Sequence, residues 1–305
     1  MAELRRLLKE GDVALEELLG IVSDEGLYRI LAGEVKGRPT VAYLGPEGTF
    51  THEAASILFP NSTLTPMPRI SDVVKSVYMG QSEYGVIPLE NSVAGIVGES
   101  VEALAEFNVG VFSCLEYRVE LCLVVNNDVE SLSEVKEIYS HPHALSEARG
   151  FLSRLNIPLK EASSTAEALN MVIGHRDRAA VASRRGALAR GLKPIVCGIE
   201  DTLNYTRFLA VKRGFNTRGS RTLLIFTVPN RPGSLYRALR PFAEGGVNLT
   251  MIYSKPTRSG LWEYLFIAEA ECSLDDPACV GAIEGLRNYA EFVKVLGSYR
   301  CLKVG

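Results

Sequence analysis

Small polar side chains recur where a short apolar run gives way to a helical pattern, and these junctions are the first places to look for chemistry. They are Thr49-Phe50-Thr51, Asn91-Ser92, Ser140-His141, Ser164-Thr165 and Ser183. Hydroxyl and amide side chains cap helices at such positions. Helix N-termini outside the carboxyl ends of strands also bind anions. Both roles remain open for each junction, and together the junctions predict a cleft for a small acid.

One junction departs from simple capping. Residues 88–92 read PLENS and bring the carboxylate of Glu90, the carboxamide of Asn91 and the hydroxyl of Ser92 to one strand end. Three different hydrogen-bonding functions side by side indicate a site. A second polar stretch, DTLNYTRF at residues 201–208, precedes an apolar strand, and its composition is equally typical of an ordinary loop.

Metal chemistry is not indicated by the histidines and cysteines. His141 and His143 flank a proline, but no third ligand follows at a recognised spacing, so we expect no metal and no cofactor. The six cysteines lie far apart and form no Cys-x-x-Cys pair. This pattern predicts buried, reduced thiols.

Composition narrows the class of protein. A chain of 305 residues with 47% hydrophobic and 23% charged residues predicts two globular domains. A net charge of −3 with interspersed signs gives no basic face for nucleic acid or anionic lipid. The first twenty residues alternate charges with leucines, and no apolar run reaches membrane-spanning length. We therefore expect a cytoplasmic protein that acts on small molecules.

The elements that position these residues follow the hydrophobic periodicity. Residues 1–38 predict a helical extension and linker. Residues 39–214 alternate short apolar strands with amphipathic helices, which predicts an α/β domain with a mostly parallel sheet. After a polar joint near residues 214–219, residues 220–305 read strand, helix, strand, strand, helix, strand, a ferredoxin-like βαββαβ domain.

Three motifs in this order resemble prephenate dehydratase. They are YLGPEGTFTH at residues 43–52, GVIPLENS at residues 85–92 and NYTRF at residues 204–208. The resemblance runs from about residue 41 to residue 271. It implies a two-lobed, periplasmic-binding-protein-like catalytic domain, with the second lobe near residues 114–190 and the substrate between the lobes.

The resemblance also implies roles for individual residues. Thr206 carries over as the catalytic residue, with Asn91 and Glu90 beside it in a network that helps the ring hydroxyl of prephenate to leave. We expect the substrate to be held by residues at the junctions and motifs, namely Thr49, Ser92, His143, Ser164, Thr165, Arg207 and Phe208. Arg207 is either a counter-charge or a salt-bridge residue. His143 stands where the family has glutamine.

The C-terminal domain is similar to an ACT domain, which implies feedback control by L-phenylalanine. The motifs RPGSLY at residues 231–236 and YSKP at residues 253–256 resemble the family's effector motifs, although the family has Glu-Ser-Arg-Pro at the second. The implied effector residues are Gly233, Ser234, Leu235, Asn248, Leu249 and Ser254. Because ACT domains pair through their sheets, we expect a homodimer or homotetramer.

The expected reaction converts prephenate to phenylpyruvate, carbon dioxide and water in phenylalanine biosynthesis. Arogenate dehydratase is the nearest alternative, because the motifs do not separate the two substrates. A non-catalytic ligand sensor is an alternative from another class, since both domains are binding architectures. An exported solute-binding protein fits the fold but needs a signal sequence.

Overall fold

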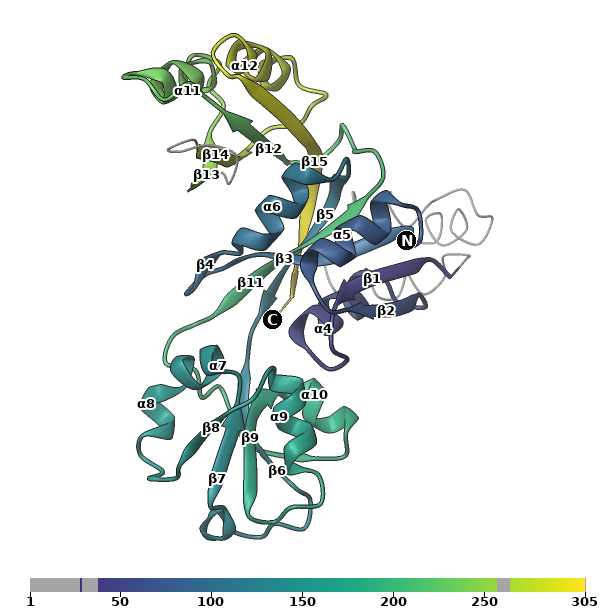
Figure 1. The fold of residues 1–305 in the computed structure, drawn as a ribbon, viewed down its shortest axis with the longest axis vertical. Helices are drawn as coiled ribbons and strands as arrows, with labels where there is room; N and C mark the ends of the chain where they lie inside the picture. Colours follow the sequence, from purple (N-terminus) through teal and green to yellow (C-terminus); the bar gives the residue numbers. More distant parts are fainter. Residues whose placement is uncertain (1–27, 29–37, 257–263, 305) are drawn as a thin grey trace.

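The computed structural model describes Tyr28, residues 38–256 and residues 264–304 (Figure 1). The predicted extension at residues 1–38 therefore lies almost wholly outside the described residues. Tyr28 is buried in the core formed around helix α4 (Phe50–Leu58), and its hydroxyl donates to the carbonyl oxygen of Leu58. Within the described part of the chain, no helix is long and apolar enough to cross a membrane.

The first lobe is a mixed sheet with helices against it. Its strands lie in the order β15-β5-β11-β3-β1-β2, and β4 pairs with β3. The strands that belong to this lobe alone are β1 (Thr40–Leu44), β2 (Thr63–Met67), β3 (Tyr84–Asn91), β4 (Gly95–Ile96), β5 (Gly110–Arg118) and β11 (Tyr205–Lys212). The helices are α4, α5 (Ile70–Tyr78) and α6 (Gly98–Glu106). Buried side chains such as Val73, Val74 and Val77 of α5 recur at helical spacing, which holds that helix on the sheet.

The second lobe is a smaller sheet in the order β10-β6-β9-β7-β8. Its strands are β6 (Leu121–Val125), β7 (Glu137–Ser140), β8 (Leu159–Glu161), β9 (Arg178–Ser183) and β10 (Lys193–Cys197). Its helices are α7 (Pro142–Glu147), α8 (Arg149–Leu152), α9 (Thr165–Val172), α10 (Arg184–Ala189) and the short 3₁₀ helix η1 (Leu132–Glu134). The expected two-lobed α/β architecture is confirmed. This sheet begins at Leu121, because residues 114–118 complete the first-lobe strand β5.

The prediction of a mostly parallel sheet is wrong at the strands that join the lobes. The chain leaves the first lobe after β5 and returns as β11, which lies antiparallel between β3 and β5. In the second lobe, β6 is likewise antiparallel to β9 and β10. A strand that returns from a separate lobe enters the sheet from the far end, and its direction is therefore reversed.

The C-terminal domain has the expected βαββαβ order. It comprises β12 (Arg221–Thr227), α11 (Ser234–Glu244), β13 (Leu249–Pro256), β14 (Tyr264–Ala270), α12 (Pro277–Arg287) and β15 (Phe292–Val304). Both helices pack on one face, where Leu224, Phe226, Phe242 and Leu286 form a buried core.

Strand β15 is 13 residues long and reaches beyond the C-terminal domain. Its first part pairs with β12 inside the C-terminal domain, and its last residues, from Arg300 to Val304, pair in parallel with β5 of the first lobe. Figure 1 shows this yellow strand running from the C-terminal domain down beside β5. The two domains therefore share one continuous sheet.

The cysteines form three disulfides, so the prediction of reduced thiols is wrong. Cys114–Cys301 joins β5 to β15 and Cys122–Cys197 joins β6 to β10, each between partners opposite one another in adjacent strands. Cys272–Cys279 closes a short loop of the C-terminal domain. Two pairs are separated by 187 and 75 residues, and pairing over such distances follows from the tertiary fold and not from local spacing.

Candidate active site

A cleft of about 330 Å³ lies between the two lobes. Its walls combine helix starts of both lobes with the strand ends where the chain crosses between them. The polar residues that line it are Thr49, Thr51, Asn91, His141, His143, Glu147, Ser163, Ser164, Thr165, Asn204 and Thr206. The junctions of the sequence thus contribute Thr49, Asn91, Ser164 and Thr165 to one cavity.

Thr206 and Asn91 lie opposite each other on the antiparallel strands β11 and β3. The Nδ2 atom of Asn91 donates to Thr206 Oγ1 at 3.0 Å and to Asn204 Oδ1 at 2.6 Å. Its Oδ1 accepts from the backbone N–H groups of Val93 and Ala94 at 2.9 and 2.8 Å, which fixes the orientation of the amide. Because Thr206 accepts a hydrogen bond from Asn91, its own hydroxyl proton is available to another acceptor.

The hydrogen-bond chain continues into the second lobe through Asn204 and Glu147, to which the sequence analysis gave no role. Asn204 is 1% exposed and donates through Nδ2 to Glu147 Oε1 at 2.6 Å. The same carboxylate oxygen lies 3.1 Å from Nδ1 of His143, one turn earlier on α7. Burial raises the pKa of Glu147, and the neighbouring His143 and Asn204 oppose that shift. The i, i+4 spacing of His143 and Glu147 was the available sequence signal.

The hydroxyls at the helix starts both cap and line the cleft. Thr49 accepts from the backbone N–H of His52 at 3.3 Å at the start of α4. Ser164 accepts from the backbone N–H of Glu167 at 3.0 Å at the start of α9. The side chains that cap these two helices therefore also line the cleft.

Two other junction serines, Ser140 and Ser183, do not line the cleft, although His141 beside Ser140 does. Ser140 is fully buried and donates to the carbonyl oxygen of Val181 at 2.6 Å. Ser183 caps α10 and donates to Glu53, a buried carboxylate that also accepts from the Tyr117 hydroxyl at 2.6 Å. Burial raises the pKa of Glu53. The bond from Ser183 to Glu53 joins the second lobe to the first, whereas Ser140 and Val181 both belong to the second lobe.

Four residues expected at the substrate lie outside the cleft. Side chains alternate along a strand, so Thr206 and Arg207 face opposite sides of the sheet, as do Asn91 and Glu90. Arg207 Nε lies 3.0 Å from Glu90 Oε2, and this pair faces the C-terminal domain. Ser92 Oγ accepts from the backbone N–H of Tyr205 at 2.9 Å, and Phe208 is 2% exposed in the core. Arg207 was expected to be either a counter-charge for the substrate or a salt-bridge residue, and its contacts are those of a salt-bridge residue.

Arg207 enters a charged network with Glu269 of the C-terminal domain. Its Nη1 lies 2.8 and 3.0 Å from the two carboxylate oxygens of Glu269, which is 0% exposed. Glu269 also accepts from Arg221, Thr250 and Tyr299. Burial opposes ionisation of Glu269, but these partners together hold its pKa below the ordinary value. The network lines a second cavity of about 350 Å³ between the domains.

Two lysines of the C-terminal domain contact α6 of the first lobe. Lys255 belongs to the YSKP motif, where the family has Glu-Ser-Arg-Pro. Its Nζ atom lies 2.7 Å from Glu102 Oε1 and donates to the carbonyl oxygen of Gly98 at 3.0 Å. Lys294 donates to the carbonyl oxygens of Leu104 and Phe107 at the end of the helix, where cations are favoured. Burial lowers the pKa of Lys294.

The expected effector residues divide into two groups. Ser234 and Leu235 line a small cavity of about 110 Å³ together with Arg231, Tyr264 and Phe266. Gly233 precedes α11 with φ of 80°, a left-handed conformation that favours glycine. The remaining residues lie on or beside β13: Asn248 donates to Glu271 at 3.2 Å, and Leu249 and Ser254 belong to the strand. These three do not line the cavity of the single chain.

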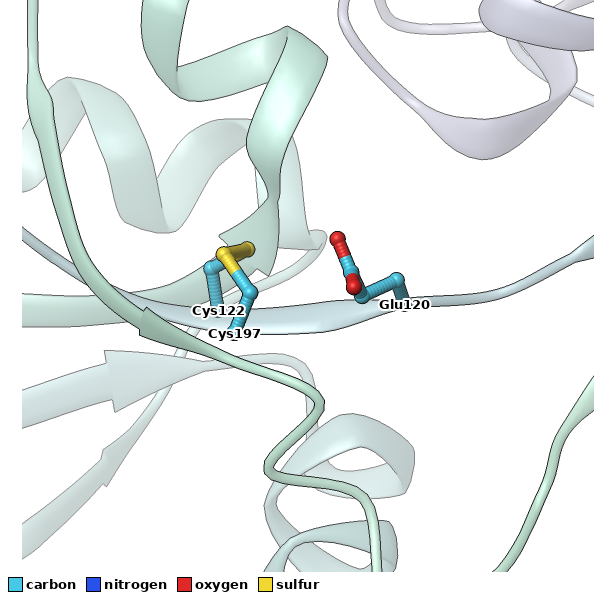
Figure 2. A group of neighbouring side chains, drawn as sticks. All are labelled: Glu120, Cys122 and Cys197. Atoms are coloured by element: carbon cyan, nitrogen blue, oxygen red, sulfur yellow. A yellow bond between two sulfur atoms is a disulfide. The ribbon is translucent and has the colours of Figure 1, made fainter. Parts of the chain in front are cut away.

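One cluster has metal-ligand residue types. Glu120, Cys122 and Cys197 place their ligand atoms within 4.8 Å of one another (Figure 2). The two sulfurs form a disulfide and therefore offer no thiolate. Glu120 is paired with Arg184 at 3.4 Å. This cluster is a cross-link beside an ion pair.

Comparison with known proteins identifies both domains. The family model "Prephenate dehydratase" matches residues 41–215, and the model "ACT domain" matches residues 222–288. A bifunctional chorismate mutase/prephenate dehydratase of Aquifex aeolicus is 35% identical over 97% of this chain and 83% of the relative. The crystal structure of prephenate dehydratase from Arthrobacter aurescens in complex with L-Phe is 30% identical, with a TM-score of 0.78 over 86% of this chain and 90% of its own. A structure described as GqqA, a novel type of quorum quenching acylase, is 29% identical with a TM-score of 0.78 over 85% of this chain and 97% of its own.

Proposed function

This chain belongs to the prephenate dehydratase family and carries a C-terminal ACT domain, and we propose that Thr206 and Asn91 perform its reaction in the cleft between the lobes. The substrate is prephenate, and the products are phenylpyruvate, carbon dioxide and water. Loss of the ring carboxylate and the ring hydroxyl makes the ring aromatic, which drives the reaction. The enzyme therefore has to help the hydroxyl leave and to hold two carboxylates.

The observation that carries the proposal is the direction of the hydrogen bond between Asn91 and Thr206. Asn91 Nδ2 donates to Thr206 Oγ1 at 3.0 Å, so the threonine O–H points its proton elsewhere. Thr206 is 8% exposed at the wall of the cleft, where a substrate hydroxyl is the acceptor that this proton meets. Proton donation by a positioned group contributes about 10² to 10⁴ in rate.

The carboxylates of the substrate meet donors at two helix starts. Thr49 and Ser164 cap α4 and α9, and Thr165 is the first residue of α9. Helix N-termini present unpaired N–H groups and a partial positive charge to anions. The two helices belong to different lobes, so one substrate with two carboxylates contacts both lobes at once.

Phenylpyruvate formation from prephenate by wild type, Thr206→Ala and Thr206→Ser tests this assignment. We expect Thr206→Ala to lower kcat by about 10² to 10⁴ and Thr206→Ser, which keeps the hydroxyl, to restore most of it. Equal turnover by Thr206→Ala and wild type would remove Thr206 from the mechanism. Turnover of arogenate in place of prephenate would support the arogenate alternative. Binding of prephenate without turnover would support the sensor.

Feedback inhibition by L-phenylalanine is the regulation that we propose for the ACT domain. The cavity beside Arg231, Ser234 and Leu235 supplies donors at the start of α11 next to the aromatic rings of Tyr264 and Phe266. The signal has a short path to the cleft, because Glu269 of β14 holds Arg207 and Arg207 is the chain neighbour of Thr206. A change in the ACT sheet therefore acts directly on the catalytic strand.

The assembly and the compartment complete the proposal. Strand β13 is the edge of the joint sheet, and Ile252 and Tyr253 on it are 45% and 39% exposed. An exposed edge with apolar side chains favours pairing with a second copy, which supports a homodimer or homotetramer. We propose that the chain acts in the cytoplasm, in the biosynthesis of phenylalanine. Its three disulfides fit a cytoplasm of the kind found in hyperthermophiles, where intracellular disulfides persist.

A further inference from the structure

Asn204 lies between the proposed catalytic pair and the second lobe, and the reaction described above gives it no part. It directly precedes β11, two residues before Thr206, and both side chains line the cleft. Asn204 is only 1% exposed. A buried carboxamide requires partners for both its oxygen and its nitrogen. The partners of these two atoms therefore indicate the role of Asn204.

The oxygen of Asn204 is one of two acceptors that share the N–H groups of Asn91. Nδ2 of Asn91 donates to Asn204 Oδ1 at 2.6 Å and to Thr206 Oγ1 at 3.0 Å. An amide nitrogen carries two hydrogens, so each acceptor receives one. Without Asn204, one buried N–H of Asn91 would lack its acceptor. The oxygen of Asn204 thus holds Asn91 in the orientation that faces Thr206.

The nitrogen of Asn204 is fixed by the second lobe. Its Nδ2 donates to Glu147 Oε1 at 2.6 Å, and the Glu147 side chain is 9% exposed. The backbone of the same segment is anchored there too, because the N–H of Asp201 donates to the carbonyl oxygen of Glu147 at 2.7 Å. The Asp201 carboxylate accepts in turn from the N–H of Gly150 at 3.0 Å. A flipped Asn204 amide would place oxygen against the carboxylate and nitrogen against nitrogen, so a single orientation satisfies both neighbours.

We propose that Asn204 is a positioning residue of the reaction, which holds the amide of Asn91 against Thr206. This inference rests on the proposed function. The directions of the bonds are fixed at both ends of the chain, by the backbone N–H groups that hold the oxygen of Asn91 and by the carboxylate of Glu147. A catalytic pair on the first lobe is therefore oriented by an acidic side chain of the second lobe.

The strands cross between the lobes without help from the Asn204 side chain. The backbone carbonyl of Asn204 accepts from the N–H of Val119 at 2.8 Å. Its neighbour Tyr205 accepts from the N–H of Ser92 at 2.8 Å and donates to Ser92 Oγ at 2.9 Å. Because these bonds use backbone atoms at Asn204 and Tyr205, a substitution of the Asn204 side chain leaves them in place.

The dependence on Thr206 distinguishes positioning from a merely structural role. Asn204→Ala should lower kcat about 10- to 100-fold, because it leaves a buried N–H of Asn91 unpaired. In a Thr206→Ala background the further loss should be about twofold or less, because no hydroxyl remains to be positioned. A structural role would cost the same factor in both backgrounds, and that result would overturn the proposal.

A reciprocal substitution tests the direction of the bonds. Asn204→Asp keeps an oxygen toward Asn91 but sets a second carboxylate against Glu147. Adding Glu147→Gln supplies an N–H for the new carboxylate, so both hydrogen bonds form again with donor and acceptor exchanged. We expect kcat of Asn204→Asp alone to be about tenfold below wild type, and that of the double variant to return to within about threefold. A double variant as slow as Asn204→Ala would contradict the proposal.

The measurements are kcat and KM for prephenate in these variants and in the control Asn170→Ala. The Asn170 side chain lies on the exposed face of α9 and accepts from Arg190 Nε at 2.9 Å. We expect the control to match wild type in kcat. The losses at Asn204 should appear mainly in kcat, because its partner acts on the departing hydroxyl. Losses confined to KM would overturn the proposal.

Nuclear magnetic resonance of the side-chain amides separates this proposal from the proposed function, because it needs no turnover. The Nδ2 hydrogens of Asn91 are assigned by their absence in Asn91→Ala. We expect them to exchange with solvent about tenfold faster in Asn204→Ala than in wild type. Such a change in a protein that does not turn over prephenate would support the contact and refute the dehydratase mechanism. Equal exchange in the two proteins would overturn the role of Asn204, even in an active enzyme.

Discussion

Replacement of Glu269 by glutamine should destabilise the protein and uncouple its domains. The carboxylate is fully buried and accepts from Arg207, Arg221, Thr250 and Tyr299. Removing one partner of a buried ion pair costs about 3–5 kcal/mol. Arg207 keeps Glu90 and Arg221 keeps Glu116 in the variant, so we expect the lower end, about 3 kcal/mol.

The assay is denaturant unfolding of wild type, Glu269→Gln and Glu244→Gln at neutral pH. Glu244 pairs with Arg240 on the exposed face of α11, and its loss should cost less than about 1 kcal/mol. The pKa of Glu269 is below its ordinary value when folded, so its contribution is complete above the unfolded pKa, about 4.3, and is lost as the pH falls through the folded pKa. The gap between wild type and Glu269→Gln should therefore close only in acid.

The Glu269→Gln variant also tests the coupling between the ACT domain and the catalytic cleft. We expect Glu269→Gln to turn over prephenate but to lose most of its inhibition by L-phenylalanine, because the ACT sheet no longer holds Arg207. A stability change below about 1 kcal/mol would refute the assignment of Glu269 as a buried ionic support. Full inhibition in a destabilised variant would show that the effector signal reaches the cleft by another path.

Three further outcomes are expected. Asn91→Ala should lower kcat by an amount close to that of Thr206→Ala, and combining the two should add little, because both act on one proton; additive losses would contradict this. Lys294→Met should cost about 1–3 kcal/mol in thermal or denaturant unfolding, since it leaves carbonyl oxygens of α6 without their donor. Cys301→Ala should destabilise the oxidised protein more than Cys279→Ala, by about 2–3 kcal/mol in the chain-entropy model, because its disulfide spans 187 residues and the other spans 7; equal losses would contradict the loop argument.

Much of the fold is encoded locally and could be predicted. The βαββαβ order of the C-terminal domain follows from changes in hydrophobic period and is confirmed. Strand β2 has little sequence signal, since it is an exposed edge strand that contains Pro66 and has little alternation. The disulfides and the last residues of β15 depend on partners far away in the sequence, so no local pattern reveals them.

The candidate site could likewise be predicted only where it depends on local sequence. Thr49, Asn91, Ser164 and Thr206 lie at helix starts or strand ends, and the structure brings them to one cleft. Glu90, Ser92 and Arg207 are adjacent in sequence to site residues but lie on the opposite face. Because side chains alternate along a strand, Thr206 and Arg207 are expected on opposite faces of the sheet. Glu147 was missed because its importance comes from Asn204, which lies 57 residues away.

The shared strand β15 has a consequence for how this protein is divided into parts. The catalytic unit is not a continuous piece of chain, because its sheet is completed by residues 300–304, the last residues of the final strand of the ACT domain. A truncation after residue 215 would remove the neighbour of β5 and expose the N–H and C=O groups of that strand, an edge prone to aggregation. Deletion of the ACT domain therefore cannot abolish regulation without also damaging the catalytic sheet. Desensitised forms should arise by point substitution within the ACT domain, with the final strand retained.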